Sequence, residues 1–149
     1  MATTAHFAVE DFQDEIDRAA GNFEVGTRLL FENDSIRVWE LQLAPGGRVP
    51  FHCHRTPYFW VCIDGGRAIQ RYPDGHLIHV EFESRDTDFL DEERLETERI
   101  HDLENTGDTA FRFHTFELLS RGPARLARLL RPSPSSDSSE AVCVPTLKR

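Results

Sequence analysis

The chain has 149 residues, of which 39% are hydrophobic, and this size and composition suit one globular domain with a single core. Its formal net charge of −9 at pH 7 argues against a nucleic-acid-binding protein, because such proteins neutralise phosphates with clustered Lys and Arg. No run of about 18 apolar residues occurs, so we expect no membrane span and no membrane partner.

The N-terminal residues predict a short amphipathic helix. Val9, Phe12, Ile16 and Ala19 recur at helical spacing, and Gly21-Asn22 ends the pattern. We assign residues 1–22 to an N-terminal helical arm. Residues 1–7 lack the basic start and apolar run of a secretory signal, and the 3 cysteines show no Cys-x-x-Cys spacing. We therefore expect reduced thiols and a cytoplasmic location.

Short β-runs follow at close intervals, with turn residues such as Pro73-Asp74-Gly75 between them. Many short strands at regular spacing predict an all-β sandwich or small barrel, which we place at residues 23–120. No internal repeat is evident, so the pattern indicates one barrel. The predicted strands are residues 27–32, 35–43, 49–54, 58–64, 67–72, 76–83, 87–90, 99–104 and 109–119.

The charge balance changes near residue 121. Residues 1–120 contain 11 basic and 24 acidic residues, a net charge of −13, whereas residues 121–149 contain 6 basic and 2 acidic residues, a net charge of +4. Residues 132–139 are rich in Ser and Pro, as disordered segments are, while Leu126, Leu129 and Leu130 predict a short helix over 124–131. We interpret 121–149 as a basic, partly disordered C-terminal tail. Alternatively, it could lie on the acidic barrel of its own subunit or of a neighbour.

Histidines on two predicted strands form the strongest functional signal. His52 and His54 are two residues apart, so in an extended strand both point to one face and could bind one metal ion. On its own, this pair is a frequent chance occurrence. Turn residues bracket the strands around it, and His101, with Asn105 four positions later, offers a third imidazole from a distant strand.

These residues resemble the motifs of the cupin superfamily. Its first motif is a Gly, five residues, His-x-His, three or four residues, Glu, six residues and Gly; here Gly46, His52, His54 and Gly65 fall in register, with Tyr58 where the Glu is expected. The second motif ends in a His and an Asn four positions later, matched by His101 and Asn105, but its earlier Pro-x-Gly is missing. The resemblance covers residues 26–119. Among cupins, the sequence is most similar to small single-domain bacterial proteins.

The resemblance implies a cupin-type double-stranded β-helix (jelly-roll barrel), to which the residue pattern adds a short helix at each end, and it implies a homodimer. It implies a divalent metal ion on His52, His54 and His101, for which we expect Fe²⁺ first and Zn²⁺, Ni²⁺ or Mn²⁺ as alternatives. The alternative is a barrel that has lost its metal. Replacement of the glutamate by Tyr58 removes one negative charge, and the phenol could bind the metal as phenolate or donate a hydrogen bond to a bound ligand. Tyr58 could also serve only in core packing.

Residues 81–104 include 11 acidic residues, and a loop at the barrel mouth could bring one of them to the site. Glu96 and Glu98, close before His101, are the candidates for a replacement ligand or a general base, although such runs are commonly solvated faces. Arg48 shares strand parity with His52 if no bulge intervenes, and could then clamp a substrate carboxylate. The sequence does not decide whether His79 or His114 faces the interior.

A pocket lined by aromatic residues would hold a small, partly apolar substrate. The aromatic residues available for this lining are Phe51, Trp60, Phe82, Phe89, Phe111, Phe113 and Phe116. We expect a metal-dependent enzyme, an Fe(II) oxygenase or a carbon–carbon bond-cleaving enzyme in first place, by analogy with three-His cupins. A Zn- or Ni-dependent lyase, isomerase or hydrolase, and a non-catalytic small-molecule-binding protein, are the alternatives.

Overall fold

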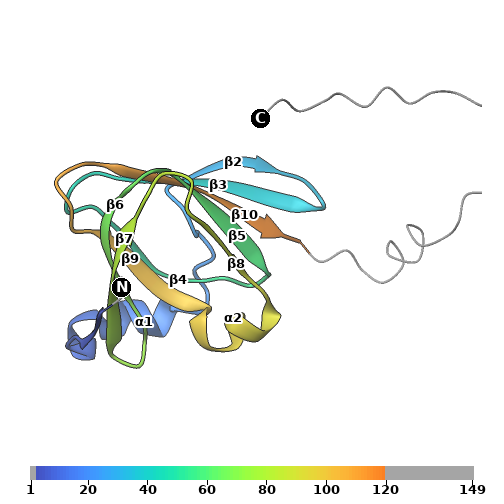
Figure 1. Cartoon of the computed structure of the whole chain (residues 1–149). Coiled ribbons are helices and arrows are strands. Elements are labelled where there is room, and N and C mark those ends of the chain that lie inside the picture. The colour runs from blue at the N-terminus through green and yellow to red at the C-terminus, as the bar shows by residue number, and fades with distance from the viewer. Residues whose placement is uncertain (1–2, 120–149) are drawn as a thin grey trace, which may run out of the picture.

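The computed structural model describes residues 3–119, and two five-stranded antiparallel sheets form its body (Figure 1). Sheet A has the order β1 (Thr3–His6), β7 (His76–Phe82), β6 (Gly66–Arg71), β9 (Ile100–Asn105), β4 (Arg48–Cys53). Sheet B has the order β2 (Arg28–Glu32), β3 (Ile36–Leu43), β10 (Phe111–Leu118), β5 (Tyr58–Asp64), β8 (Thr87–Leu90). This architecture confirms the all-β jelly-roll prediction.

All nine predicted strands are present, with ends that differ by at most two residues. The additional strand is β1, which pairs with β7 from Thr3↔His79 to His6↔His76 at the edge of sheet A. Its polar residues gave no alternation signal. The predicted helix over 124–131 and the tail at 121–149 lie outside the described residues.

The core lies between the two sheets, because each strand turns alternate side chains inward. On β10 the side chains of Phe111, Phe113, Thr115 and Glu117 are buried, while the intervening ones are more exposed. Phe111 is fully buried and packs with Phe113 at a ring-centroid distance of 5.3 Å. Packed with these rings are the apolar side chains of Leu41, Leu43, Val49, Cys62 and Ala68.

The N-terminal helix begins as a 3-10 turn (Val9–Phe12) and continues as α1 (Gln13–Ala19), which lies against β4 of sheet A (Figure 1). A second helix, α2 (Glu92–Glu98), occupies part of the acidic segment expected to be a loop. The Asp91 carboxylate accepts the Arg94 N–H and caps its N-terminus, and the buried Leu95 anchors it. Within residues 3–119 neither the length nor the hydropathy of any helix reaches what a bilayer crossing needs.

The predicted turn at Pro73-Asp74-Gly75 joins β6 to β7. Gly75 has a φ of 94°, which a residue with a side chain rarely adopts, and its N–H donates to the Tyr72 carbonyl. The hairpin sets the register of β6 on β7 and turns Gln70 and Ile78 toward the interior.

Candidate metal centre

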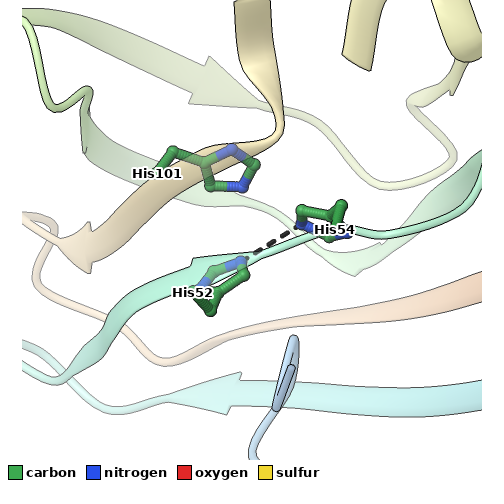
Figure 2. Close-up of side chains that lie close together, drawn as sticks. All are labelled: His52, His54 and His101. Carbon is green, nitrogen blue, oxygen red and sulfur yellow. Dashed lines mark hydrogen bonds between the residues drawn. The ribbon is translucent and has the colours of Figure 1, made fainter. Parts of the chain in front are cut away.

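Three histidines meet between the sheets on two neighbouring strands of sheet A (Figure 2). His52 on β4 lies directly opposite His101 on β9, and His54 follows one residue after the end of β4. The side chains are 2%, 2% and 8% exposed for His52, His54 and His101. Strand pairing therefore brings together residues that are about fifty positions apart in the sequence.

The three rings are spaced as ligands of one ion are. Their centroids are 4.8–5.0 Å apart, and one nitrogen from each ring lies within 4.8 Å of the other two. The Nε2 atoms of His52 and His54 are 3.2 Å apart. With this spacing, the three histidines could hold a single metal ion.

Hydrogen bonds fix the proton on two of the rings. His52 Nδ1 donates to the Pro50 carbonyl at 2.8 Å, and His101 Nδ1 donates to the Glu98 carbonyl at 3.0 Å, since a carbonyl can only accept. Both rings therefore present the Nε2 lone pair to the centre, as metal-binding histidines do. His54 Nδ1 is buried without a hydrogen-bond partner among residues 3–119. The donor set fits a divalent ion.

The protein keeps these imidazoles neutral. Burial lowers the pKa of His52 to about 3, helped by the neighbouring His101, and lowers the pKa of His101 to about 4. Burial and the two other rings hold the pKa of His54 well below its ordinary value. Neutral imidazole is the form that coordinates transition metals, so at neutral pH the rings are ready to bind.

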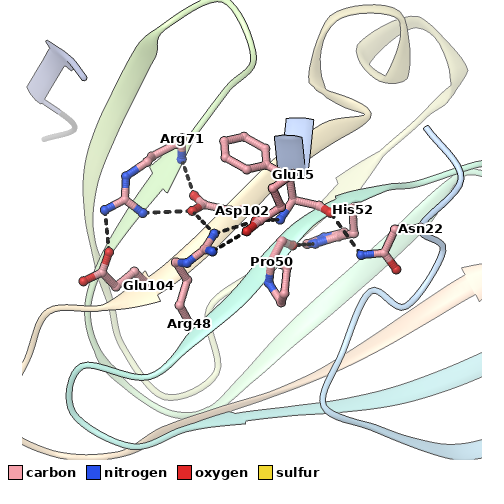
Figure 3. A network of polar contacts seen from close by, with 9 residues as sticks. Glu15, Asn22, Arg48, Pro50, His52, Arg71, Asp102 and Glu104 are labelled. Carbon is pink, nitrogen blue, oxygen red and sulfur yellow. Dashed lines mark hydrogen bonds and ion pairs between the residues drawn. The ribbon is translucent and has the colours of Figure 1, made fainter. Parts of the chain in front are cut away.

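A β-bulge in β4 orients His52. The register of β4 on β9 shifts between Val49 and His52, which leaves Pro50 and Phe51 outside the ladder. Pro50 has no N–H, Phe51 N–H donates to Glu15 Oε1 at 2.7 Å, and Asn22 Nδ2 donates to the Phe51 carbonyl at 3.0 Å (Figure 3). Every polar backbone group of the bulge thus has a partner, and the strand is held in this register.

The same bulge overturns the strand-parity argument for Arg48, which does not line the cavity. Arg48 lies on the outer side of sheet A, where Nη2 pairs with Glu15 at 2.6 Å and Nη1 pairs with Asp102 at 2.9 Å (Figure 3). Arg71 also pairs with Asp102, at 2.8 Å, and with Glu104. The network fastens α1 to sheet A and leaves Arg48 with no route to a substrate beside the histidines.

Tyr58, at the position of the expected glutamate, stacks on His54. The ring centroids are 3.8 Å apart at an interplanar angle of 10°. Burial raises the pKa of the Tyr58 phenol, and nearby Tyr72 and Glu98 raise it further, so the hydroxyl keeps its proton at neutral pH. Tyr58 therefore supports the His54 ring and offers a neutral hydroxyl.

The histidines open on a cavity of about 230 Å³ between the sheets. Its apolar wall includes Trp60, Phe82 and Phe113, whose rings pack edge to face at 4.8–5.4 Å. The other predicted lining rings lie elsewhere: Phe51 contacts Phe7 and Phe12, Phe111 is in the core, and Phe89 and Phe116 are on the outer side of sheet B. Most of the cavity wall is apolar, and polar side chains reach it at several points.

The cavity is also lined by polar groups that the sequence did not reveal. Gln70 Nε2 donates to the Tyr72 hydroxyl at 2.7 Å, and burial raises the pKa of Tyr72 to about 12. Gln70 shares its strand face with Ala68, and only the pairing of β6 with β7 and β9 shows that this face is internal.

The helix α2 brings charged residues to the cavity. Arg94 pairs with Asp88 at 2.8 Å and with Glu98 at 3.1 Å, and all three line the cavity. Glu96 is exposed on another face of α2 and does not line it. Of the two glutamates singled out in the sequence, Glu98 is therefore the one placed near the histidines.

The remaining candidates have other roles. His79 is exposed on β7, and His114 lies 3.6 Å from Glu40 on the outer side of sheet B. Asn105 is fully buried and fixes a turn, because its Nδ2 donates to the carbonyls of Leu43 and Thr109 and its Oδ1 accepts the Gly107 N–H. None of these three lines the cavity.

No family model matches the sequence, and no curated protein matches it. Among solved structures, the chain is similar to a cupin domain from Bordetella pertussis Tohama I, with 22% identity and a TM-score of 0.55 over 62% of this chain and 91% of that chain. A protein from Bacillus halodurans has 18% identity and a TM-score of 0.49 over 78% of this chain and 83% of that chain. A conserved protein with a double-stranded β-helix domain from Klebsiella pneumoniae has 18% identity and a TM-score of 0.47 over 71% of this chain and 95% of that chain.

The similarity to the Bordetella cupin domain shows the fold of the two sheets described above. The sequence motifs, the sheet order and this similarity agree. The described part of the chain has the cupin fold.

Proposed function

We propose that the protein binds a divalent metal ion through His52, His54 and His101 and acts as a metal-dependent enzyme on a small, partly apolar molecule. Within this class we propose an Fe(II) oxygenase or a carbon–carbon bond-cleaving enzyme. One observation carries the proposal: three neutral, buried imidazoles converge at one side of a mainly apolar cavity of about 230 Å³.

The donor set bears on the kind of substrate. Three neutral ligands leave the double positive charge of the ion uncompensated, and an anionic or chelating group would balance it. Bound Fe(II) would supply open coordination positions for such a group and for dioxygen. The size of the cavity limits the substrate to a small molecule.

The residues of the chain would bind and orient this substrate. The rings of Trp60, Phe82 and Phe113 would contact its apolar part and exclude water. Gln70 donates to the Tyr72 oxygen, which leaves the Tyr72 proton free to be donated to a substrate oxygen. The stacked ring of Tyr58 would keep His54 in place.

The test is metal analysis of freshly purified protein, followed by oxygen uptake with a panel of small α-hydroxy ketones, diketones and thiols. We expect one equivalent of iron and oxygen uptake that requires Fe²⁺. His52→Ala and His101→Ala should remove the metal while circular dichroism shows a folded barrel, and the exposed His79→Ala serves as the control. Stoichiometric metal in both cavity variants would disprove the site.

Other outcomes would select the alternative functions. Stoichiometric Zn²⁺ or Ni²⁺ without oxygen uptake would replace the oxygenase by a lyase, isomerase or hydrolase in which the metal is a Lewis acid. A metal-free protein that still binds a small molecule would be a non-catalytic binding protein. The homodimer and the cytoplasmic location stay predictions.

A further inference from the structure

A row of apolar side chains crosses the whole outer face of sheet B. The strand registers pair Phe31 with Val38, Val38 with Phe116, Phe116 with Phe59, and Phe59 with Phe89. Residues directly opposite each other in a sheet share a face, so these five side chains form one line over β2, β3, β10, β5 and β8. Four strand spacings make the line about 19 Å long.

The two ends of the row and the adjoining Leu118 are unusually exposed for apolar residues, while Val38, Phe59 and Phe116 between them are partly buried. Phe31 is 52% exposed, Phe89 is 49% exposed and Leu118 is 38% exposed. Phe59 and Phe116 stack at a centroid distance of 4.6 Å. An antiparallel sheet with one face in water normally places polar residues there, and a continuous apolar surface of this kind marks a docking site. We call these six residues the outer surface.

The two sheets differ in how their outer faces are covered. Sheet A is covered where α1 lies on β4, through Glu15 and the stacking of Phe12 with Arg48 and Arg71. The exposure of Phe31 and Phe89 shows that no element within residues 3–119 covers the two ends of the row on sheet B. Among residues 3–119, the outer face of sheet B therefore has no covering segment that corresponds to α1 on sheet A.

We propose that the C-terminal segment 120–149 of the same chain docks on the outer surface. The segment follows Leu118, which belongs to that surface, and Gly122-Pro123 offers a reversal of direction. Residues 119–123 reach about 17 Å when extended, and an eight-residue helix over 124–131 is about 12 Å long. The segment is therefore long enough to return to the row and to cover much of it.

The side chains of the segment match the surface. Leu126, Leu129 and Leu130 fall on one face of the predicted helix, and Arg125, Arg128 and Arg131 alternate with them in the sequence. The leucines would contact the phenylalanines, while the arginines would remain at the rim.

Charge favours this occupant over a second copy of the barrel. Residues 121–149 carry a net charge of +4 and residues 1–120 carry −13, so the segment is attracted to its own body, whereas two bodies repel each other. Acidic side chains are exposed at both edges of sheet B: Glu32 lies on β2, and Asp91, Glu92 and Glu93 follow β8. Glu32 already pairs with Arg37 and Asp91 already caps α2, so Glu92 and Glu93 are the carboxylates that the arginines of the segment would meet.

The experiment uses the full-length chain, the fluorescent probe 8-anilinonaphthalene-1-sulfonate, and light scattering after size exclusion for the molar mass. The variant combines Leu126→Asp with Leu129→Asp. The control combines Val142→Asp with Leu147→Asp, which adds the same charge in the same segment outside the predicted helix. We expect a severalfold rise in probe fluorescence for the leucine variant, no rise for the control, and the same molar mass for the wild type and both variants. Adding Phe89→Ser and Phe116→Ser to the leucine variant should abolish most of the rise.

Four results would overturn the proposal. Equal fluorescence in the wild type, variant and control would mean that the leucines do not cover the surface. A rise that persists after the two phenylalanine substitutions would place the exposed apolar area elsewhere. A wild-type dimer that dissociates in the leucine variant would assign the segment to a neighbour's surface, and a wild-type dimer that dissociates on Phe89→Ser with Phe116→Ser alone would assign the surface to a second copy.

Discussion

Substitution of Asp102 by Asn tests the ion-pair network that joins α1 to sheet A. The Asp102 carboxylate is fully buried and accepts three hydrogen bonds: from Arg48 Nη1 at 2.9 Å, from the Arg71 backbone N–H at 2.9 Å, and from Arg71 Nη1 at 2.8 Å. Asp102→Asn keeps the shape of the side chain and can keep the bond from the backbone N–H. It removes the negative charge between two guanidinium groups.

The size of the effect follows from what each arginine retains. Removal of one partner from a buried ion pair costs roughly 3–5 kcal/mol. Arg48 still has Glu15, and Arg71 still has Glu104, so neither charge is left without a counterion. We therefore expect the lower end of the range, about 3 kcal/mol of unfolding free energy, which for an m-value of about 2 kcal/mol/M lowers the urea midpoint by about 1.5 M.

The assay is urea denaturation followed by circular dichroism at pH 7 and 25 °C. Asp108→Asn is the matched control, because Asp108 also pairs with an arginine, Arg67, at 3.3 Å, but the two side chains are 94% and 58% exposed. The control should change the unfolding free energy by less than about 0.5 kcal/mol. If Asp102→Asn costs no more than this control, the network does not stabilise the fold and the reasoning is refuted.

Three further predictions concern the helix, the metal centre and a turn. The hydrogen bond from Arg48 lowers the pKa of Glu15 below its ordinary value of 4.5, so the carboxylate stabilises the fold above that pH. In urea titrations, Glu15→Gln should therefore have a lower free energy of unfolding than wild type. The difference should be largest at pH 7 and shrink as the pH falls through the pKa of Glu15 in the folded protein; a difference that does not change with pH would contradict this. Tyr58→Phe should retain stoichiometric metal by plasma emission analysis, because the ring that stacks on His54 is kept, and metal loss would show that the hydroxyl is needed. Asn105→Ala should cost about 3 kcal/mol in thermal or urea unfolding, since it leaves buried carbonyls without donors, and a cost below about 1 kcal/mol would disprove that role.

Local pattern was sufficient for every strand within residues 3–119 except β1, and for the pair His52 and His54. Alternation of apolar residues and turn residues such as Gly75 depend only on neighbours in sequence, and these positions appear in the structure within two residues of the predicted ends. The group of three histidines could be predicted because the spacing of His52 and His54 is local, and because the resemblance to a known motif supplied the distant His101.

Nonlocal geometry explains the residues that were misplaced. Arg48 has the parity of His52 in an unbroken strand, but the bulge at Pro50 and Phe51 turns it to the outer side. A proline inside a predicted strand is the signal that a bulge was present.

The sequence predicts a loop before His101 and does not decide between Glu96 and Glu98, whereas in the structure the two residues lie on the helix α2. Asp91 as N-cap and the acidic residues of the first turn could have predicted α2, and helical spacing then separates the two glutamates on different faces. Gln70 and Tyr72 had no sequence signal, because their inward direction depends on how β6 pairs with β7 and β9.

The bulge in β4 has a practical consequence for protein design. The N–H of Phe51 is satisfied by Glu15 from α1, and its carbonyl is satisfied by Asn22 from the segment after that helix. A transplant of the three histidines alone into another barrel would leave these two groups unpaired and allow β4 to slip back into a regular ladder. The smallest transferable unit is therefore the pair of strands together with the N-terminal helix, which is as much a part of the site as the histidines themselves.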